Sequence, residues 1–303
     1  IACETLGLVV GGTITGLEGS GLVLSNNGGD DLPIAANGSF KFVKPVLSGA
    51  TYAVAVKANP TGPAQTCAVT AGTGTVTDVD VTTVTVACTT HSFKVKGSVV
   101  GLTGAGLVLT NNGGDDLAIT KDGAFAFATA VKSGAAFAVT VKTQPTGPVQ
   151  TCTVAGGTGT VASSDVASVI VNCANDRYTV GGAVIGLAGK GLVLTNNGGD
   201  DLAIGANGGF AFATPLTGGA AYSVTIKTQP LDPAQTCEVV GGTGTVGAGP
   251  VNSVAINCSR TLVVVGGTVT GLKGAGLVLS NNGTDDLKIS GNGTFAFPVA
   301  LPA

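Results

Sequence analysis

The sequence predicts an all-β protein made of tandem seven-stranded antiparallel β-sandwiches with an 85-residue period. Three observations predict this fold class. One stretch of sequence returns at a constant step, short runs of alternating apolar residues lie between turn signals, and a pair of cysteines recurs in each of the three complete periods. The fixed period is the first guide to the architecture, because it defines the unit that folds.

The period is clearest at residues 21–32, whose sequence is Gly-Leu-Val-Leu-Ser-Asn-Asn-Gly-Gly-Asp-Asp-Leu. The stretch returns at 106–117, at 191–202 and, with one Gly changed to Thr, at 276–287. This step is too long for a solenoid repeat and suits a small domain. We therefore expect repeats at 6–90, 91–175 and 176–260, the first half of a fourth at 261–303, and the end of a preceding repeat's last strand at 1–5.

Each repeat consists of short β-type segments. In the first repeat they lie at 8–15, 21–25, 32–34, 40–42, 52–56, 67–69 and 84–88. Alternation with a period of two indicates strands with one buried face. Pairs such as Asn27-Gly28 and Asn37-Gly38 supply the turns between them. Phenylalanines two positions apart, at 40/42, 125/127, 210/212 and 295/297, share one strand face, and we expect them in the core.

Each of the first three repeats also owns two cysteines, and the spacing between the two is the same every time. With a single histidine in the chain and no CxxC motif, an even pair of this kind indicates a disulfide and not a zinc site. Closing such a loop is worth roughly 3 kcal/mol on the chain-entropy model. The expected disulfides join Cys67 to Cys88, Cys152 to Cys173 and Cys237 to Cys258.

Cys3 precedes Cys88 by one full period and so has the phase of a second cysteine. Its partner is expected upstream of Ile1, which makes the chain a segment of a longer repeat protein. The alternative is that Cys3 bonds a second subunit, as a leftover cysteine in a secreted chain can do. Disulfides persist in oxidising compartments, so an extracellular or cell-surface location is expected in either case.

Composition narrows the classes of partner. Charged residues make up 10% of the chain and the mean hydropathy is +0.48, which argues against disorder. A net charge of −3 with two arginines argues against a nucleic-acid partner. No apolar run is long enough to span a membrane. Sparse charge also leaves little repulsion between surfaces, so the expected partners are copies of the chain or neighbouring repeats of the same polypeptide.

The motif order resembles a known family. Residues 12–17, 21–24, 37–42 and 49–56 follow the order Gly-x-Val/Ile-x-Gly-Leu, Gly-Leu-Val-Leu, Asn-Gly-x-Phe-x-Phe and Gly-x-x-Tyr-x-Val-x-Val. This order resembles tandem bacterial Ig-like repeats of the carboxypeptidase-regulatory, or prealbumin-like, β-sandwich type. The resemblance implies an Ig-like sandwich and a role as a stalk or fibre element of a bacterial surface or secreted protein.

The only polar cluster in every repeat is the Asn-Asn-Gly-Gly-Asp-Asp stretch at 26–31 and its counterparts. Asn-Gly is a strong hairpin-turn signal, and a structural turn is the main interpretation. Calcium binding is the alternative, since Ca²⁺ takes six to eight oxygen ligands and one turn offers fewer. No cofactor is otherwise expected. The calcium candidates are Asn26, Asp30, Asp31, Asn111, Asp115, Asp116, Asn196, Asp200 and Asp201.

Catalysis finds little support in the sequence. His91 is the only histidine, and the residues one and two periods later are Asp176 and Thr261, so no Ser-His-Asp or Cys-His site can recur. Lys57, Lys142 and Lys227 recur at a strand end, where an isopeptide crosslink to asparagine is a further alternative. Asn37, Asn282 and Asn292 begin formal glycosylation sequons. We expect no enzyme.

These observations favour a structural extracellular protein, a rod or filament of tandem disulfide-stapled domains. About four residues separate the last strand of one repeat from the first of the next, which indicates stiff connections. The alternative is a ligand-binding adhesin module that recognises a glycan or a host protein. Binding repeats should differ in their loops, whereas repeats two and three share the stretch Gly-Leu-Val-Leu-Thr-Asn-Asn-Gly-Gly-Asp-Asp-Leu-Ala-Ile unchanged.

Overall fold

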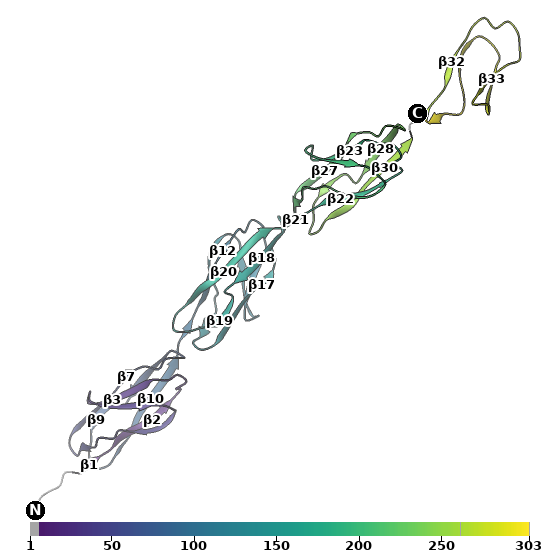
Figure 1. Ribbon diagram of the computed structural model, residues 1–303. Helices are drawn as coiled ribbons and strands as arrows, with labels where there is room; N and C mark the ends of the chain where they lie inside the picture. The colour runs from purple at the N-terminus through teal and green to yellow at the C-terminus, as the bar shows by residue number, and fades with distance from the viewer. Residues whose placement is uncertain (1–5, 261, 303) are drawn as a thin grey trace, which may run out of the picture. The chain divides into compact units, whose positions relative to one another are not determined.

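The computed structural model describes residues 6–260 and 262–302. Throughout this part of the chain the regular secondary structure is β-strand (Figure 1). The chain divides into two compact units between Ala174 and Asn175, and the short stretch Gly147–Val149 belongs to the second unit. Repeats 1 and 2 therefore make up most of the first unit, and repeat 3 with the partial repeat 4 makes up the second.

Repeats 1 to 3 have the same series of ten strands. In repeat 1 these are β1 Gly7–Leu8, β2 Val10–Thr15, β3 Leu22–Asn26, β4 Asp30–Ile34, β5 Gly38–Lys41, β6 Val46–Leu47, β7 Thr51–Ala58, β8 Gln65–Thr70, β9 Thr73–Thr75 and β10 Val81–Thr90. In repeat 2 they are β11 Ser92–Phe93, β12 Val95–Val100, β13 Leu107–Asn111, β14 Asp115–Ile119, β15 Gly123–Ala126, β16 Val131–Lys132, β17 Ala136–Thr143, β18 Gln150–Ala155, β19 Thr158–Thr160 and β20 Val166–Asn175. In repeat 3 they are β21 Arg177–Tyr178, β22 Val180–Ile185, β23 Leu192–Asn196, β24 Asp200–Ile204, β25 Gly208–Ala211, β26 Leu216–Thr217, β27 Ala221–Thr228, β28 Gln235–Val240, β29 Thr243–Thr245 and β30 Val251–Arg260.

Two four-stranded sheets form each sandwich. In repeat 1 the strand orders are β5-β2-β10-β8 and β4-β3-β7-β9, and a short pair, β1-β6, lies beside them. Repeats 2 and 3 have the same orders at their own strands. The prediction of an all-β chain of tandem β-sandwiches is confirmed.

The strand count and one pairing differ from the prediction of seven antiparallel strands. The two main sheets of a repeat contain eight strands. The additional strand is β9, Thr73–Thr75, which pairs with β7 at the edge of its sheet. It was not predicted because its Thr-Gly-Thr sequence has no apolar alternation. The pairing of β2 with β10 is parallel, with Thr13 opposite Thr85. The last two cysteine-bearing strands, β8 and β10, are antiparallel neighbours but not a simple hairpin, since β9 between them belongs to the other sheet.

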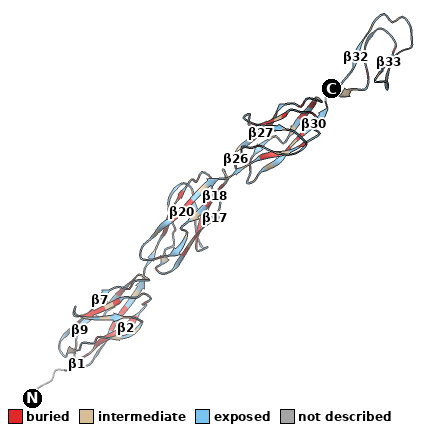
Figure 2. Ribbon diagram, viewed as in Figure 1, coloured by how far each residue is buried: buried red, intermediate tan, exposed pale blue. Residues whose placement is uncertain are grey.

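The core lies between the two sheets of each repeat, as the buried residues in Figure 2 show. In repeat 1 Leu22, Leu24, Val84 and Val86 have no exposed surface. The paired phenylalanines lie as expected, with Phe42 only 2% exposed. The Phe40 and Phe42 rings meet edge to face with centroids 5.9 Å apart, a favoured geometry for aromatic pairs.

Repeat 4 is described as three two-stranded sheets. Its strands are β31 Leu262–Val263, β32 Gly266–Val269, β33 Leu277–Asn281, β34 Asp285–Ile289, β35 Gly293–Ala296 and β36 Leu301–Pro302. They pair as β31-β36, β32-β35 and β33-β34. The side chains of Leu277 and Leu279 are half-buried, whereas their counterparts Leu22 and Leu24 in repeat 1 are completely buried.

Candidate functional site

The polar stretch at 26–31 forms a tight turn between β3 and β4. Asn27 has φ +49° and Gly28 has φ +69°, so two consecutive residues adopt the left-handed conformation that Asn-Gly tolerates. The Asn27 side-chain amide donates to the Thr51 carbonyl at 3.0 Å. The neighbouring Asn26 is 4% exposed and accepts from the Ala53 backbone N–H at 3.0 Å. Both asparagines thus tie the turn to β7.

The two aspartates that follow have separate partners. Asp30 accepts from the Lys44 backbone N–H at 3.2 Å, whereas Asp31 forms an ion pair with the Lys57 ammonium. The counterparts in repeats 2 and 3 repeat this division: Asp115 accepts from Thr129 N–H, Asp200 accepts from Thr214 N–H, Asp116 pairs with Lys142, and Asp201 pairs with Lys227.

In each repeat the three calcium candidates therefore make contacts with three different parts of the repeat. In each repeat the asparagine oxygen faces a backbone amide of β7, one aspartate faces a backbone amide after β5, and the other faces a lysine. Within residues 6–260 and 262–302 there is no cluster of three or more His, Cys, Asp or Glu side chains that could hold a metal ion.

A β-bulge places the recurring lysine. On β3, Val23 and Leu24 are consecutive, but their partners on β7 are Ala58 and Val56, so Lys57 is an extra residue in the pairing. Bulges of this kind redirect a side chain. The strand order β4-β3-β7 puts Lys57 and Asp31 on the two strands that flank β3, and their ion pair spans it. The partner of this lysine is an aspartate and not the asparagine that an isopeptide crosslink would use.

The ion pairs of repeats 2 and 3 affect proton binding. The Lys142 ammonium holds the pKa of Asp116 below its ordinary value, and the neighbouring Thr110 hydroxyl lowers it further. Lys227 and Thr195 lower the pKa of Asp201 in the same order. The side chains of Lys142 and Asp116 are 54% and 40% exposed, so solvent screens this interaction and its contribution to stability is small.

One disulfide closes each of the first three repeats. The bonds join Cys67 to Cys88, Cys152 to Cys173 and Cys237 to Cys258, each across 21 residues. Cys67 and Cys88 lie directly opposite each other on β8 and β10. Each bond therefore ties the edge strand of a sheet to its long neighbour. Cys3 lies outside the described residues.

A buried glutamine precedes the first cysteine in every complete repeat, and sequence reasoning missed it. Gln65 is 3% exposed; its oxygen accepts from the Glu18 and Gly19 N–H groups at 2.9 and 2.8 Å, and its amide donates to the Gly16 carbonyl at 2.7 Å. Gln150 and Gln235 make the same three bonds in their own repeats. The available signal was the Gln-Thr-Cys sequence, which recurs at 65–67, 150–152 and 235–237.

A second polar side chain fixes the same loop. Asn37 accepts from the Leu17 N–H at 2.8 Å and donates to the Leu17 carbonyl at 2.9 Å. Asn292 makes the equivalent pair of bonds with Leu272. Two of the three formal sequons thus begin with an asparagine whose side chain is used inside its own repeat.

The junction between repeats 1 and 2 lies within the first compact unit. His91 donates its backbone N–H to the Ala64 carbonyl at 3.0 Å and accepts at its own carbonyl from the Ser133 N–H at 2.8 Å. Ala64 N–H in turn donates to the Ser133 hydroxyl at 2.8 Å. A closed set of three hydrogen bonds therefore links the loop before β8 of repeat 1, the connecting residue and repeat 2.

The same connection recurs within the second unit. There the Asp176 N–H donates to the Val149 carbonyl at 3.0 Å, and the Gly218 N–H donates to the Asp176 carbonyl at 2.9 Å. His91 and Asp176 occupy the same phase of the repeat, so the backbone and not the side chain makes this link. The His91 ring approaches the Thr66 hydroxyl at 2.7 Å and stacks on Phe93.

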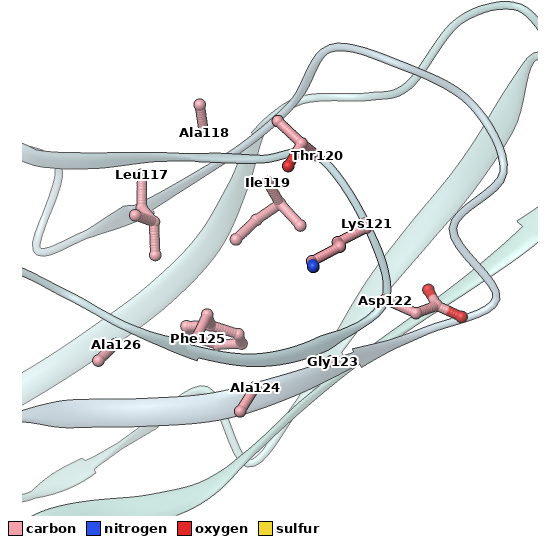
Figure 3. A pocket seen from close by; sticks show the side chains of 10 residues that line it. All are labelled: Leu117, Ala118, Ile119, Thr120, Lys121, Asp122, Gly123, Ala124, Phe125 and Ala126. Carbon is pink, nitrogen blue, oxygen red and sulfur yellow. The ribbon is translucent and has the colours of Figure 1, made fainter.

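A shallow groove opens at the same place in every repeat, between the edge strands of the two sheets. In repeat 2 its volume is about 480 Å³, and Figure 3 shows Leu117, Ile119 and Phe125 pointing into it while Lys121 and Asp122 lie at the connecting loop. Equivalent grooves lie along 32–41, 202–211 and 287–296. Ile119 and Phe125 are each 8% exposed, so the floor of the groove is the side of the core.

The comparisons with known proteins give distant similarities of fold. No protein-family model matches the chain, and no curated protein matches it either. Among solved structures, the Bacillus anthracis TIE protein is 11% identical with a TM-score of 0.48, over 85% of this chain and 52% of that one. The pilus adhesin SpaC from Lactobacillus rhamnosus GG is 12% identical with a TM-score of 0.22, over 84% of this chain and 43% of that one.

The chain thus spans about half the length of the first of these proteins and less than half of the second. Both TM-scores are below 0.5, so neither similarity carries an argument about what this chain does. None of the described segments is a helix long and apolar enough to cross a membrane.

Proposed function

We propose that the chain is a structural extracellular or cell-surface protein, a rod or filament component built from tandem disulfide-stapled Ig-like domains of the carboxypeptidase-regulatory type. The observation that carries the proposal is the identity of the supporting contacts from repeat to repeat. The disulfide, the buried glutamine and the lysine–aspartate pair all recur at the 85-residue step.

The junction supports a spacer role. Between repeats 1 and 2, Ala64, His91 and Ser133 are hydrogen-bonded to one another. The connection between these two sandwiches is therefore not a flexible tether. Disulfides persist in oxidising compartments, which supports the extracellular or cell-surface location. In this proposal the protein has no catalytic activity and needs no cofactor, because its recurring polar side chains are occupied by bonds within each repeat.

An adhesin module that binds a glycan or a host protein is the alternative. Its binding site would be the groove between the edge strands of the two sheets. The turn at the end of this groove has the same role in every repeat, because one side chain in it accepts a hydrogen bond from the backbone of an earlier loop. These side chains are Asn37, Asp122, Asn207 and Asn292. Electron microscopy of the purified protein, together with a glycan-binding assay, separates the two proposals. Extended particles without glycan affinity are expected; isolated globules with measurable glycan affinity would overturn the structural role.

A further inference from the structure

The first and last long strands of each complete repeat are neighbours and run parallel. In repeat 2 these strands are β12 and β20, which pair in the middle of a four-stranded sheet with Val99 opposite Val171 (Figure 1). The strands β2 and β10, and β22 and β30, pair in the same way. Only the two-residue strand β11 precedes β12 in repeat 2, and β20 is its last strand. The chain therefore enters and leaves the sandwich through two strands that lie side by side.

The parallel direction places the two connections of a repeat at opposite ends of this pair. The pair begins where the Lys94 carbonyl accepts from the Val166 N–H at 2.9 Å, and it ends at Val100, opposite Asn172. The preceding chain joins the pair at its first end, whereas the following chain leaves from its last end. Tension applied along the chain therefore pulls the two strands past each other, along their own axes.

Tension in this direction is resisted by many hydrogen bonds at once. The bonds of a parallel ladder are evenly spaced along the strands, so sliding one strand past the other strains all of them together. In an antiparallel pair both connections would lie at the same end, and tension would break the bonds one after another. Forced unfolding is governed by the barrier to unfolding, so the parallel arrangement should raise the force that a repeat withstands.

Packing along the pair adds to this resistance. Val95 and Val99 on β12, like Val169 and Val171 on β20, are at most 1% exposed, so sliding the strands also moves buried side chains through the core. Gly97 allows the two backbones to lie close together, because a Cβ there would be 2.2 Å from the Val169 carbonyl oxygen. The equivalent glycines of repeats 1 and 3 approach their partner strands in the same way; they are Gly12 and Gly182.

The disulfide limits how far a repeat extends after the pair has separated. Cys173 on β20 is bonded to Cys152 on β18, so tension passes through the sulfur–sulfur bond and not through the chain between them. The two cysteines are 21 positions apart, and about 70 Å of extended chain therefore stays closed.

From this arrangement we propose that the parallel pairs β2–β10, β12–β20 and β22–β30 carry mechanical tension along the chain, and that the disulfides limit the extension of each repeat. The inference rests on the proposed function and deepens it, because a rod or filament component at a cell surface transmits pulling force. The bond that begins the pair in repeat 2 recurs in the other two repeats, from Val81 N–H to the Val9 carbonyl and from Val251 N–H to the Thr179 carbonyl.

Pulling the folded chain in two directions tests the proposal. Optical tweezers hold the full chain by DNA handles on azide-bearing residues, which leaves the cysteines unchanged. Handles at the exposed positions of Lys94 and Ala174 pull on opposite ends of the β12–β20 pair. Handles at the exposed positions of Thr103 and Ala174 pull on the same end, where a Cβ on Gly101 would lie 2.4 Å from the Cys173 carbonyl oxygen. Equal thermal unfolding midpoints show that both labelled chains are folded alike.

The force that opens repeat 2 should be roughly twofold or more higher with the handles on opposite ends. In the Cys152→Ser/Cys173→Ser variant, the extension in that direction should lengthen by about 70 Å. The positions of Thr179, Ala188 and Ser259 give the same two directions in repeat 3, should the labels destabilise repeat 2.

Equal forces in the two directions, a larger force with both handles on the same end, or an extension that the variant leaves unchanged would overturn the inference. The proposed function would survive such a result, since it fails only if dilute single copies prove compact by solution scattering.

Discussion

Gln150 illustrates how much of each repeat depends on one uncharged polar side chain. It is 1% exposed, and its amide group satisfies two backbone N–H groups and one carbonyl of the loop that follows β12. These three backbone groups are therefore hydrogen-bonded to a side chain and not to a neighbouring strand. An unsatisfied buried polar group is costly, which makes the glutamine more important than its lack of charge indicates.

Replacing this side chain should destabilise repeat 2. In Gln150→Leu the three backbone groups lose their partners while the volume stays similar, and we expect a loss of about 3 kcal/mol. Urea unfolding of the whole chain measures it. The exposed Thr153 on the same strand gives the control: Thr153→Ala should move the midpoint little. Equal shifts in the two variants would show that Gln150 has no special role.

The Lys142–Asp116 pair predicts a specific response to acid. The pKa of Asp116 is lower in the folded chain than its ordinary value of 3.8. A carboxylate with a lowered folded pKa stabilises the fold above its unfolded pKa, and this stabilisation is lost as the pH falls through the folded value. The thermal unfolding midpoint of the wild type should therefore fall below about pH 4. Asp116→Asn should remove part of that dependence, whereas the same change at exposed Asp78 should not; an unchanged slope in Asp116→Asn would contradict this.

At the scale of the strands, the pattern of apolar residues was enough to predict much of the fold. Alternation located the buried strands, and the Phe-x-Phe spacing located the ring pair in the core, because both follow from the two-residue period of a strand. Strand β9 was missed because Thr73-Gly-Thr75 has no apolar member. The Lys57 bulge was also missed, since an extra residue is visible only against its partner strand.

The polar contacts were less accessible to sequence reasoning. The turn at 26–31 was correctly placed, but the partners of Asn26, Asp30 and Asp31 come from residues 53, 44 and 57, which only the folded sheet brings near. The parallel pairing of β2 with β10 likewise joins segments about 70 residues apart. Local periodicity contains no information about such pairings.

The disulfides should contribute to stability chiefly through the unfolded chain. Removing the bond of repeat 2 with Cys152→Ser/Cys173→Ser releases a loop of 21 residues, and we expect a loss of about 3 kcal/mol. Calorimetry of the whole chain should show one transition moving to lower temperature while the others stay. Movement of all transitions together would show that the repeats do not unfold as separate units.

At the scale of the whole molecule, the junction decides whether the repeats act as separate domains. Ser133 is 5% exposed, whereas its repeat-1 counterpart Ser48 is exposed. The Ser133 hydroxyl accepts from the Ala64 N–H of the preceding repeat. Sequence reasoning predicted a short connection but could not identify these contacts, because they join residues far apart in the chain.

Removing the hydroxyl should loosen this junction. In Ser133→Ala the Ala64 N–H loses its acceptor, so hydrogen exchange measured by mass spectrometry should become several-fold faster for peptides that contain Ala64. Ser48→Ala removes the equivalent hydroxyl from repeat 1, where it donates to Thr77 within the same repeat, and should leave Ala64 unaffected. Unchanged exchange in Ser133→Ala would mean that the bond does not hold the junction.

Small-angle X-ray scattering of dilute single copies tests the central proposal most directly. A strand of about ten residues spans about 33 Å, so three sandwiches joined end to end as a stiff rod should give a radius of gyration of about 30 Å or more. A single compact domain of this length would give about 19 Å. A radius of gyration of about 30 Å or more, with a constant cross-section, is the expected result, whereas a value of about 19 Å would contradict the structural rod.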